Sequence, residues 1–282
     1  LKSLKSTGKG AVILPHGVLF RGNAEATIRK ALLQRGYIKG IIGLPANLFY
    51  GTGIPACIIV IDKENAQART GVFMIDASKG FIKDGNKNRL RARDIHKIVD
   101  VFNKQTEVAR YSRMVPLAEI ASTSNNYNLN IPRYIDSSEP EDLQDLYAHL
   151  HGGIPNRDLD ALSDYWKAFP TLRSTLFKAN RPGYSHLAIE LDQVQQAILD
   201  SKEFKEFARR VQVRLRAWFA QFRPALEAID SNAKPSQLIS ELGEDLLLRF
   251  RPVPLLDEYD VYEQLMDYWQ STMNDDVALI MG

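Results

Sequence analysis

Gly51, Thr52 and Gly53 are the first residues whose types and spacing suggest chemistry, because glycines around a hydroxyl resemble part of a nucleotide-binding loop. The triplet stands between two apolar runs and no amphipathic helix follows it. We therefore expect its glycines to supply turn geometry. The sequence contains no nucleophile elbow, Walker loop or dinucleotide fingerprint. Residue types and spacing alone assign no reaction.

Histidine and cysteine positions argue against a metal site and a thiol nucleophile. The five histidines lack zinc-site spacing, and His149 and His151 precede a Gly-Gly break without a third candidate ligand nearby. No metal ligand is predicted. The single cysteine, Cys57, lies in an apolar run, which predicts a buried inert thiol and excludes a disulfide framework.

Five cations follow one another closely in a segment with a turn signal at Asp84-Gly85. This basic cluster consists of Lys83, Lys87, Arg89, Arg91 and Arg93. We place it on a loop, with Asp94 as the N-cap of a following helix whose apolar face carries Ile95, Ile98, Val99 and Phe102. Flexible cations on a loop suit the phosphates of a DNA backbone, although a charged loop can also be merely solvated.

Charge is unevenly distributed along the chain. Residues 1–113 contain 20 Lys and Arg against 8 Asp and Glu, whereas residues 114–282 contain 16 against 26, so the formal net charge of +2 conceals a basic and an acidic lobe. A basic lobe suggests contact with a polyanion, and the acidic lobe suggests a different partner. Two ordinary solvated surfaces would have the same counts.

Residues 10–63 have the pattern strand, helix, strand, strand, with the helix at 24–34. The predicted strands are the apolar runs 11–14, 38–44, 56–61 and, continuing the sheet, 70–76. The connection from 45 to 55 is too short for a crossover helix. We therefore predict that its two flanking strands form an antiparallel hairpin on the edge of a sheet otherwise built by crossovers.

Three domains or segments are predicted. Residues 1–113 form the α/β part, 114–140 an extended strap docked by apolar anchors, and 141–282 a helical domain. The strap anchors are Leu117, Ile120, Leu129, Ile131 and Tyr134. The longest helical stretch is expected from about 187 to 222, and the stripe Tyr259, Tyr262, Met266, Trp269 and Met273 is interpreted as core or a helix interface rather than a cofactor site. No apolar run is long enough for a bilayer and no signal peptide opens the chain, so we expect a cytoplasmic protein.

Five phrases, taken in order, closely resemble the modification (M) subunit of type I restriction-modification systems, an N6-adenine DNA methyltransferase. They are LKSTGKGAVILPHGVLFRGNAEATIRKALL, GIIGLPANLFYGTGIPACIIVIDK, KDGNKNRLRARDIHKIV, NNYNLNIPRYID and LLDEYDVYEQLMDYWQSTMNDDV. The resemblance implies the rear half of a Rossmann-like class I methyltransferase sheet ending in an antiparallel hairpin, plus a C-terminal all-α domain. The opening at Leu1, in the middle of such a pattern, suggests a piece of a longer chain.

The same resemblance implies S-adenosylmethionine as the methyl donor of the intact protein. Members of this family bind it on a glycine-rich loop and orient the adenine with an Asn-Pro-Pro-aromatic motif, and neither motif occurs here. No catalytic or cofactor-binding residue is carried over. We expect that this polypeptide alone neither binds the methyl donor well nor transfers a methyl group.

One functional position of the family does correspond to this sequence. The loop before the last hairpin strand presents an aromatic side chain that stacks on a flipped base, and LPANLFYGTGIPA has Phe49 at that position with Tyr50 beside it. Stacking would return part of the energy lost when the base leaves its duplex. In the alternative interpretation, Phe49 packs under its own loop.

The resemblance also implies partners: DNA, a specificity (S) subunit docked on the C-terminal helices, and indirectly a restriction (R) subunit. Two other classes stay open. A non-catalytic DNA-binding or assembly module could use the same fold, and salt-sensitive binding by residues 1–113 would favour it. A different α/β enzyme, such as a dehydrogenase-like domain, would need a phosphate-binding loop that the sequence lacks.

Overall fold

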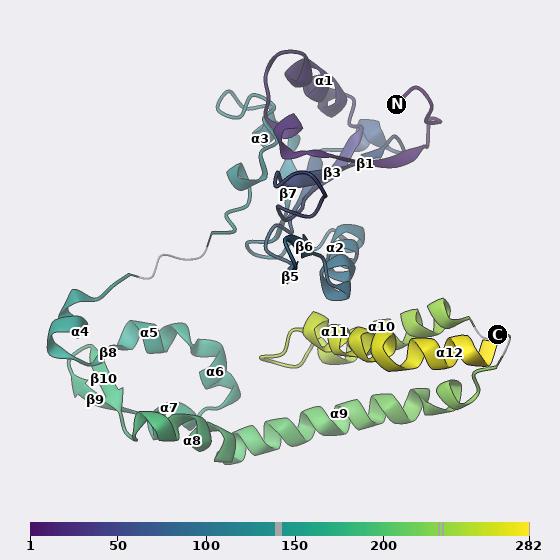
Figure 1. Cartoon of the computed structure of the whole chain (residues 1–282). Coiled ribbons are helices and arrows are strands. Elements are labelled where there is room, and N and C mark those ends of the chain that lie inside the picture. Colours follow the sequence, from purple (N-terminus) through teal and green to yellow (C-terminus); the bar gives the residue numbers. More distant parts are fainter. Residues whose placement is uncertain (139–142, 231, 233, 282) are drawn as a thin grey trace. The chain divides into compact units, whose positions relative to one another are not determined.

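The computed structural model describes residues 1–138, 143–230, 232 and 234–281. The chain divides into two units, residues 1–140 and 141–282 (Figure 1). The predicted boundary between the strap and the helical domain falls on residues 139–142, which lie outside the described residues.

Runs rich in Ile and Val form a five-stranded sheet in unit 1, with strand order β1-β3-β2-β4-β7. Its strands are β1 (Lys9–Pro15), β2 (Ile38–Gly43), β3 (Ala56–Asp62), β4 (Gly71–Asp76) and β7 (Ser112–Pro116). The predicted hairpin is confirmed: β2 and β3 pair antiparallel, with Ile41 opposite Ile59. β4 pairs with β2 in parallel and continues the sheet as expected.

The predicted edge position of this hairpin is wrong. β3 pairs antiparallel with β1 as well as with β2, so the reversed strand lies inside the sheet. Its nearly continuous apolar sequence, ACIIVID, suits a strand with neighbours on both sides. β7, which is antiparallel to β4, is an outer strand of the described sheet, and it begins at Ser112, before the predicted start of the strap at 114.

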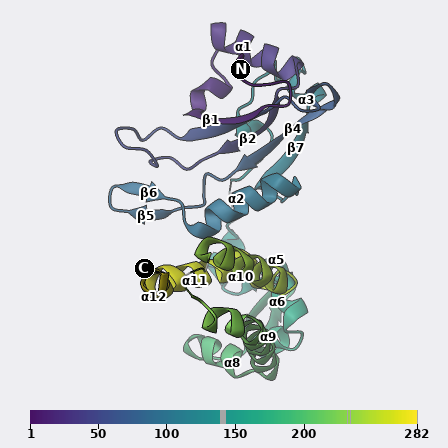
Figure 2. The same cartoon turned by 90° about the vertical axis from the view of Figure 1, so that its right-hand side faces the viewer.

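Helices cover both faces of the sheet. Figure 2 shows α1 (Asn23–Gln34) on one face and α2 (Ala92–Lys104) on the other. Leu33 of α1 packs with Ile41, and Ile98 of α2 packs with Phe73 in a separate cluster. After α1 the chain turns at Gly36 (φ +65°), where a Cβ would lie 2.0 Å from the carbonyl oxygen of Ala66, so only glycine fits.

Helix α2 differs from the prediction at its start and on its buried face. Arg91, not Asp94, is the N-cap, and Asp94 accepts a 2.9 Å hydrogen bond from the Arg91 backbone N–H. This bond to the carboxylate of the third helical residue starts the helix before the acidic residue. Ile95 and Val99 are half exposed, while Ile98 and Val101 are buried with Phe102 partly covered, because the face that meets the sheet is offset from the predicted stripe.

The strap is docked as expected. Ile120, Leu129, Ile131 and Tyr134 are buried against the α1 face of the sheet, and Leu117 is partly buried there. The segment is not wholly extended: its start completes β7, and α3 (Leu117–Ile120) and a 3₁₀ turn at Ile131–Arg133 follow.

A small hairpin joins the sheet to α2. Strands β5 (Ile82–Asp84) and β6 (Lys87–Arg89) pair antiparallel around the predicted turn, where Gly85 has φ +58°. The basic cluster therefore lies on this hairpin and on the first turn of α2, rather than on an irregular loop.

Unit 2 is mainly helical. Its helices are α4 (Leu146–His151), α5 (Asn156–Ala161), α6 (Ser163–Ala168), α7 (Leu172–Leu176), α8 (Val194–Asp200), α9 (Lys202–Glu227), α10 (Pro235–Phe250), α11 (Glu258–Tyr268) and α12 (Asn274–Met281). A π-helical turn, η5 (Trp269–Met273), joins the last two. The helical part of the fold prediction is thus confirmed.

Two details of the helical prediction are wrong. Unit 2 also contains a sheet of order β8-β10-β9, so it is not all-α. Its strands are β8 (Ile154–Pro155), β9 (Phe177–Arg181) and β10 (Tyr184–Leu187). These strands are too short to interrupt a helical pattern. The stretch 187–222 is not one helix either, because Ser201 caps a new one by accepting a 3.1 Å hydrogen bond from Phe204 N–H.

The aromatic stripe is core, as interpreted. Trp218 of α9, Leu242 and Phe250 of α10 and Trp269 of η5 form one buried cluster. Tyr259 and Met266 of α11 are also buried. The helices α9 to α12 therefore share one hydrophobic core.

Candidate nucleic-acid interface

The carboxyl ends of three strands meet at one side of the unit 1 sheet. β1 and β2 are both antiparallel to β3, and β4 is parallel to β2, so all three run in the same direction. Their last residues, Pro15, Gly43 and Asp76, define what we call the carboxyl edge. Ligands of open α/β sheets bind at this edge, which makes it the first place to look for a site.

The loop 44–55 leaves the carboxyl edge between β2 and β3 and has an exposed aromatic tip. The side chain of Phe49 is 39% exposed and that of Tyr50 is 93% exposed. Gly51 (φ +78°) takes a left-handed conformation that turns the chain back toward β3. Phe49 is thus not enclosed beneath its own loop, and a planar ligand can reach its ring.

The β5–β6 hairpin holds this loop through Lys87 and Asn88. The Lys87 ammonium donates to the carbonyl oxygens of Phe49 (2.7 Å) and Thr52 (3.2 Å). Asn88 donates from Nδ2 to the carbonyl of Ala46 (2.7 Å) and from its backbone N–H to that of Asn47 (2.9 Å). The basic hairpin and the aromatic loop therefore form one continuous surface.

The remaining cations of the basic cluster differ in their surroundings. Arg89 pairs with Asp84 across the hairpin at 3.2 Å, and Arg91 pairs with Asp94 at 2.9 Å. Lys83 is exposed, with its ammonium 5.8 Å from the centroid of the Phe81 ring. An exposed ion pair contributes little stability, so Arg89 can exchange its carboxylate for a phosphate at low cost.

A basic cavity of about 310 Å³ lies beside the carboxyl edge. Its charged and polar lining includes Asp76, Lys79, Arg91, Arg93, Asp94, Lys97, Arg110, Tyr111 and Ser137. Ser137 Oγ donates a 2.6 Å hydrogen bond to Asp76, and Lys79 donates to the Ser137 carbonyl. Burial, reinforced by the carboxylates of Asp94 and Asp76, raises the pKa of Tyr111, which keeps its hydroxyl protonated.

Sequence reasoning found only part of this lining. Arg91 and Arg93 belonged to the predicted cluster. Lys79 did not, although it comes shortly before Lys83, and Arg110 and Tyr111 did not because they follow the cluster only after α2. A signal that could have found Arg110 and Tyr111 is their position just before β7, the strand next to β4.

His16 is a further residue that was not predicted from the sequence. It follows β1 at the carboxyl edge, and its backbone N–H donates to the Pro55 carbonyl at the end of loop 44–55 (3.0 Å). Its Nε2 is buried without a hydrogen-bond partner among the described residues. Burial lowers the pKa of His16, against a smaller opposing effect of Asp76.

Metal and thiol chemistry receive no support from the described part of the chain. No group of three or more His, Cys, Asp or Glu side chains is arranged there to hold a metal ion. Cys57 is buried in β3, and burial raises the pKa of its thiol to about 11. In the same residues, no helix is both long and apolar enough to cross a bilayer.

Residues 1–143 match the family model described as N-6 DNA methylase. The chain belongs to the N-6 DNA methylase family. The match includes the five-stranded sheet, loop 44–55 and the basic cluster. It agrees with the resemblance seen in the sequence and with a methyltransferase-like α/β unit.

Curated relatives of this N-6 DNA methylase family member are methylase subunits of type I restriction enzymes. The MpnII subunit from Mycoplasma pneumoniae is 32% identical over 168 residues, which is 60% of this chain and 29% of the relative. The MjaVII subunit from Methanocaldococcus jannaschii is 36% identical over 146 residues, 50% of this chain and 25% of the relative. The chain thus spans less than a third of the length of these relatives.

A solved structure is also similar to this family member. The type I restriction-modification methyltransferase subunit from Streptococcus thermophilus shares 46% sequence identity, with coverage of 48% of this chain and 28% of that chain, at a TM-score of 0.44.

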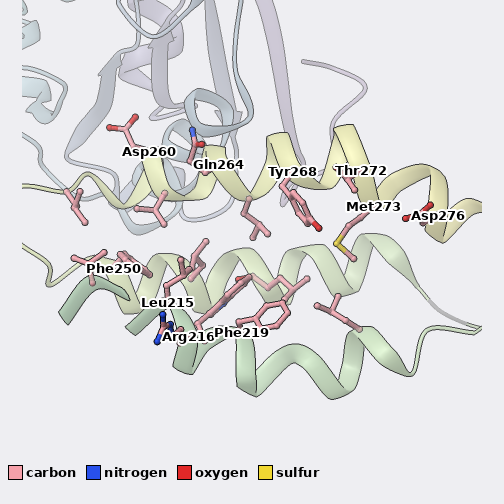
Figure 3. Close-up of a pocket in the computed structure, with 18 residues that line it drawn as sticks. Leu215, Arg216, Phe219, Phe250, Asp260, Gln264, Tyr268, Thr272, Met273 and Asp276 are labelled. Carbon is pink, nitrogen blue, oxygen red and sulfur yellow. The ribbon is translucent and has the colours of Figure 1, made fainter. Parts of the chain in front are cut away.

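Unit 2 contains a separate feature, an apolar groove of about 1270 Å³. Figure 3 shows it between α9, which contributes Leu215 and Phe219, and the helix that carries Tyr268. Phe250 of α10 also lines it. Phe219 is 52% exposed, so this groove presents aromatic surface to solvent. Asp260, Asp276, Gln264 and Arg216 add polar groups to the lining.

Proposed function

We propose that this chain is part of the M subunit of a type I restriction-modification enzyme, which methylates adenine N6 in DNA. The observation that carries the proposal is the family match over residues 1–143. The methylase-subunit names of the curated relatives support it. The exposed aromatic loop at the carboxyl edge is consistent with binding of an extrahelical base.

In this function Phe49 stacks on the flipped adenine, with Tyr50 beside it. Its ring is accessible, and the Lys87 and Asn88 hydrogen bonds restrain the loop that carries it. A base pulled from its duplex loses its stacked neighbours, and an aromatic face returns about 1–3 kcal/mol of that energy.

The basic cluster contributes contacts to the DNA backbone. We assign Lys83, Arg89 and Arg93 to phosphates, because they lie on the hairpin and on the first turn of α2. Arg91 and Lys87 face more specific protein partners, Asp94 and the carbonyls of loop 44–55. The basic cavity adds Lys79 and Arg110 to the same positive surface.

S-adenosylmethionine is the methyl donor that the family implies. Most of the residues that line the basic cavity are charged, and we do not assign the adenosine of the donor to it. We assign no residue of this chain to the donor and no catalytic residue. We expect no methyl transfer from these 282 residues alone.

The helices of unit 2 are proposed to dock the S subunit, and through it the R subunit indirectly. The apolar groove offers a surface for an amphipathic helix, with Phe219 and Tyr268 as exposed anchors. The acidic lining residues Asp260 and Asp276 favour a partner helix that carries Lys or Arg beside its apolar stripe.

The test is a methylation assay with the complete M subunit that contains this chain, assembled with S. Phe49→Ala should lower kcat/KM for adenine N6 methylation by about 5-fold to 150-fold, the equivalent of one lost stacking contact. Phe20→Ala is the matched control, since Phe20 is a similarly exposed phenylalanine of unit 1. Unchanged turnover of Phe49→Ala would remove the stacking role.

The alternative, a non-catalytic DNA-binding module, has a separate outcome in this assay. Salt-sensitive binding of duplex DNA of any sequence by the assembled protein, without methyl transfer to adenine, would favour it over the methyltransferase. The observation that supports this alternative is the excess of Lys and Arg in residues 1–113.

A further inference from the structure

Two consecutive residues of β6 hold four carbonyl groups of a loop about 40 residues earlier in the chain. Lys87 binds the carbonyls of Phe49 and Thr52, and Asn88 those of Ala46 and Asn47. These carbonyls lie on both sides of the exposed loop tip. The contact is therefore a clamp around the tip, and we call it the 87/88 clamp.

Loop 44–55 has weak bonding of its own. Asn47 N–H reaches the Gly53 carbonyl at 3.4 Å, and Ile54 N–H reaches Thr52 Oγ1 at 3.1 Å. Left-handed backbone at Asn47 (φ +58°) adds conformational cost. Hydrogen bonds from an ammonium are stronger than those between neutral groups, so Lys87 is a major source of order in this loop.

The partners of Lys87 also bear on its role in DNA binding. An ammonium has three donors, and in Lys87 two of them point at loop carbonyls rather than outward. Asn88 is only 6% exposed, which places the second half of the clamp out of reach of a DNA backbone. Lys83 of the neighbouring strand is exposed and is free of this restriction.

We propose that Lys87 and Asn88 are positioning residues, which hold loop 44–55 so that Phe49 is presented to a flipped base. The presentation of Phe49 to a base rests on the proposed function, but the clamp itself can be measured without DNA. It assigns Lys87 to the loop and leaves the phosphate contacts to neighbours such as Lys83. The hairpin also carries those neighbours, so a phosphate contact there is connected to the aromatic loop through the clamp.

The first experiment measures amide hydrogen exchange in the 282-residue chain. The Asn88 N–H, bonded to the Asn47 carbonyl, reports on the junction between hairpin and loop. Lys87→Met keeps the aliphatic stem and removes the donors, and it should speed exchange at Asn88 by about tenfold or more. Lys87→Arg should restore most of the protection. Lys83→Met, on the same hairpin, should leave it unchanged. Equal exchange in wild type and Lys87→Met would overturn the clamp.

The second experiment uses the complete enzyme assembled with S and DNA that carries 2-aminopurine at the target position. Lys87→Met should reduce the fluorescence increase on base flipping and lower kcat by tenfold or more. It should keep the slope of log Kd against log salt unchanged. Lys83→Met should lower that slope by about 0.9. A slope lowered in Lys87→Met with normal flipping would make Lys87 a phosphate contact and overturn the inference.

The two experiments separate the failure of the inference from the failure of the proposed function. If the wild-type enzyme neither flips nor methylates adenine, the proposed function fails, and the positioning role fails with it. The exchange experiment then still decides whether the clamp exists. If the wild type flips the base and Lys87→Met flips it equally well, only the positioning role is overturned.

Discussion

Nε of Arg29, on α1, donates a 2.8 Å hydrogen bond to the backbone carbonyl of Tyr127 in the strap. Nη1 of the same guanidinium donates to the carbonyls of Val18 and Arg21, at 3.0 and 3.1 Å. Arg29 is only 7% exposed. One buried cation thus ties the strap to α1 and to the turn that follows β1, which places it at the junction between the first and last segments of unit 1.

Arg29→Met should destabilise unit 1 by about 3 kcal/mol, because three carbonyls lose a charged donor in a buried setting. Hydrogen exchange of the β2 and β4 amides, which open only on global unfolding of the unit, measures the loss. Arg35→Met is the control: Arg35 is exposed at the end of the same helix, and its removal should cost less than about 0.5 kcal/mol. Equal protection in the two variants would contradict the assigned role.

The half-buried His16, whose Nε2 atom is buried, predicts a pH dependence of stability. In the folded state burial depresses the pKa of His16 below its ordinary value of 6.5. Between the two pKa values the unfolded chain binds more protons than the folded chain, so the free energy of unfolding falls as the pH falls. Above about pH 7.5 the group is neutral in both states and contributes no pH dependence.

His16→Gln should therefore flatten the loss of stability below pH 6.5, by at most about 1.4 kcal/mol per pH unit. Urea denaturation at pH 5.0, 6.0 and 7.5 measures it. Asp76 is the opposing charge, so Asp76→Asn should steepen the same loss by removing the group that favours protonated His16. Identical pH profiles for wild type and His16→Gln would rule out the contribution.

The strands and helices of unit 1 were largely predictable because their signals are local. The apolar runs of β1 to β4 and the amphipathic pattern of α1 can each be recognised from a few neighbouring residues. The place of β3 between β1 and β2 was not predictable in this way, since strand order depends on pairing between distant segments. Short strands such as β8, with two residues, carry too little pattern to be distinguished from helix or turn.

In the candidate site, too, some residues were predicted from the sequence and others were not. Phe49 was selected because the resemblance to the M subunit marks its position, and the basic cluster because its cations are close together in the sequence. The functional roles of both remain predictions. The bond from Lys87 to the Phe49 carbonyl was not foreseeable, because it joins two hairpins separated by 38 positions and involves a backbone atom that carries no sequence signal. Lys79 and Arg110 were likewise missed, because folding alone brings them to one cavity.

The basic cavity predicts a specific salt effect on DNA binding. If a backbone phosphate enters it, Arg110→Gln should lower the slope of log Kd against log salt by about 0.9 in the assembled enzyme. Lys104→Gln is a suitable control, because Lys104 lies at the far end of α2 and pairs with Asp100. A slope unchanged in Arg110→Gln would show that no phosphate is neutralised there.

If the S subunit docks in the apolar groove of unit 2, its binding should be sensitive to a charged substitution there. Phe219 is already half exposed in this chain, so Phe219→Asp should change the free energy of unfolding by less than about 1 kcal/mol. If an S-subunit helix covers the groove, the same change buries an unpaired carboxylate and should weaken S binding by about 30-fold or more. Leu279→Asp is the matched control, since Leu279 is 81% exposed and does not line the groove. Calorimetric titration of S into each M variant measures the affinity, and equal binding by the two variants would move the docking site to another surface.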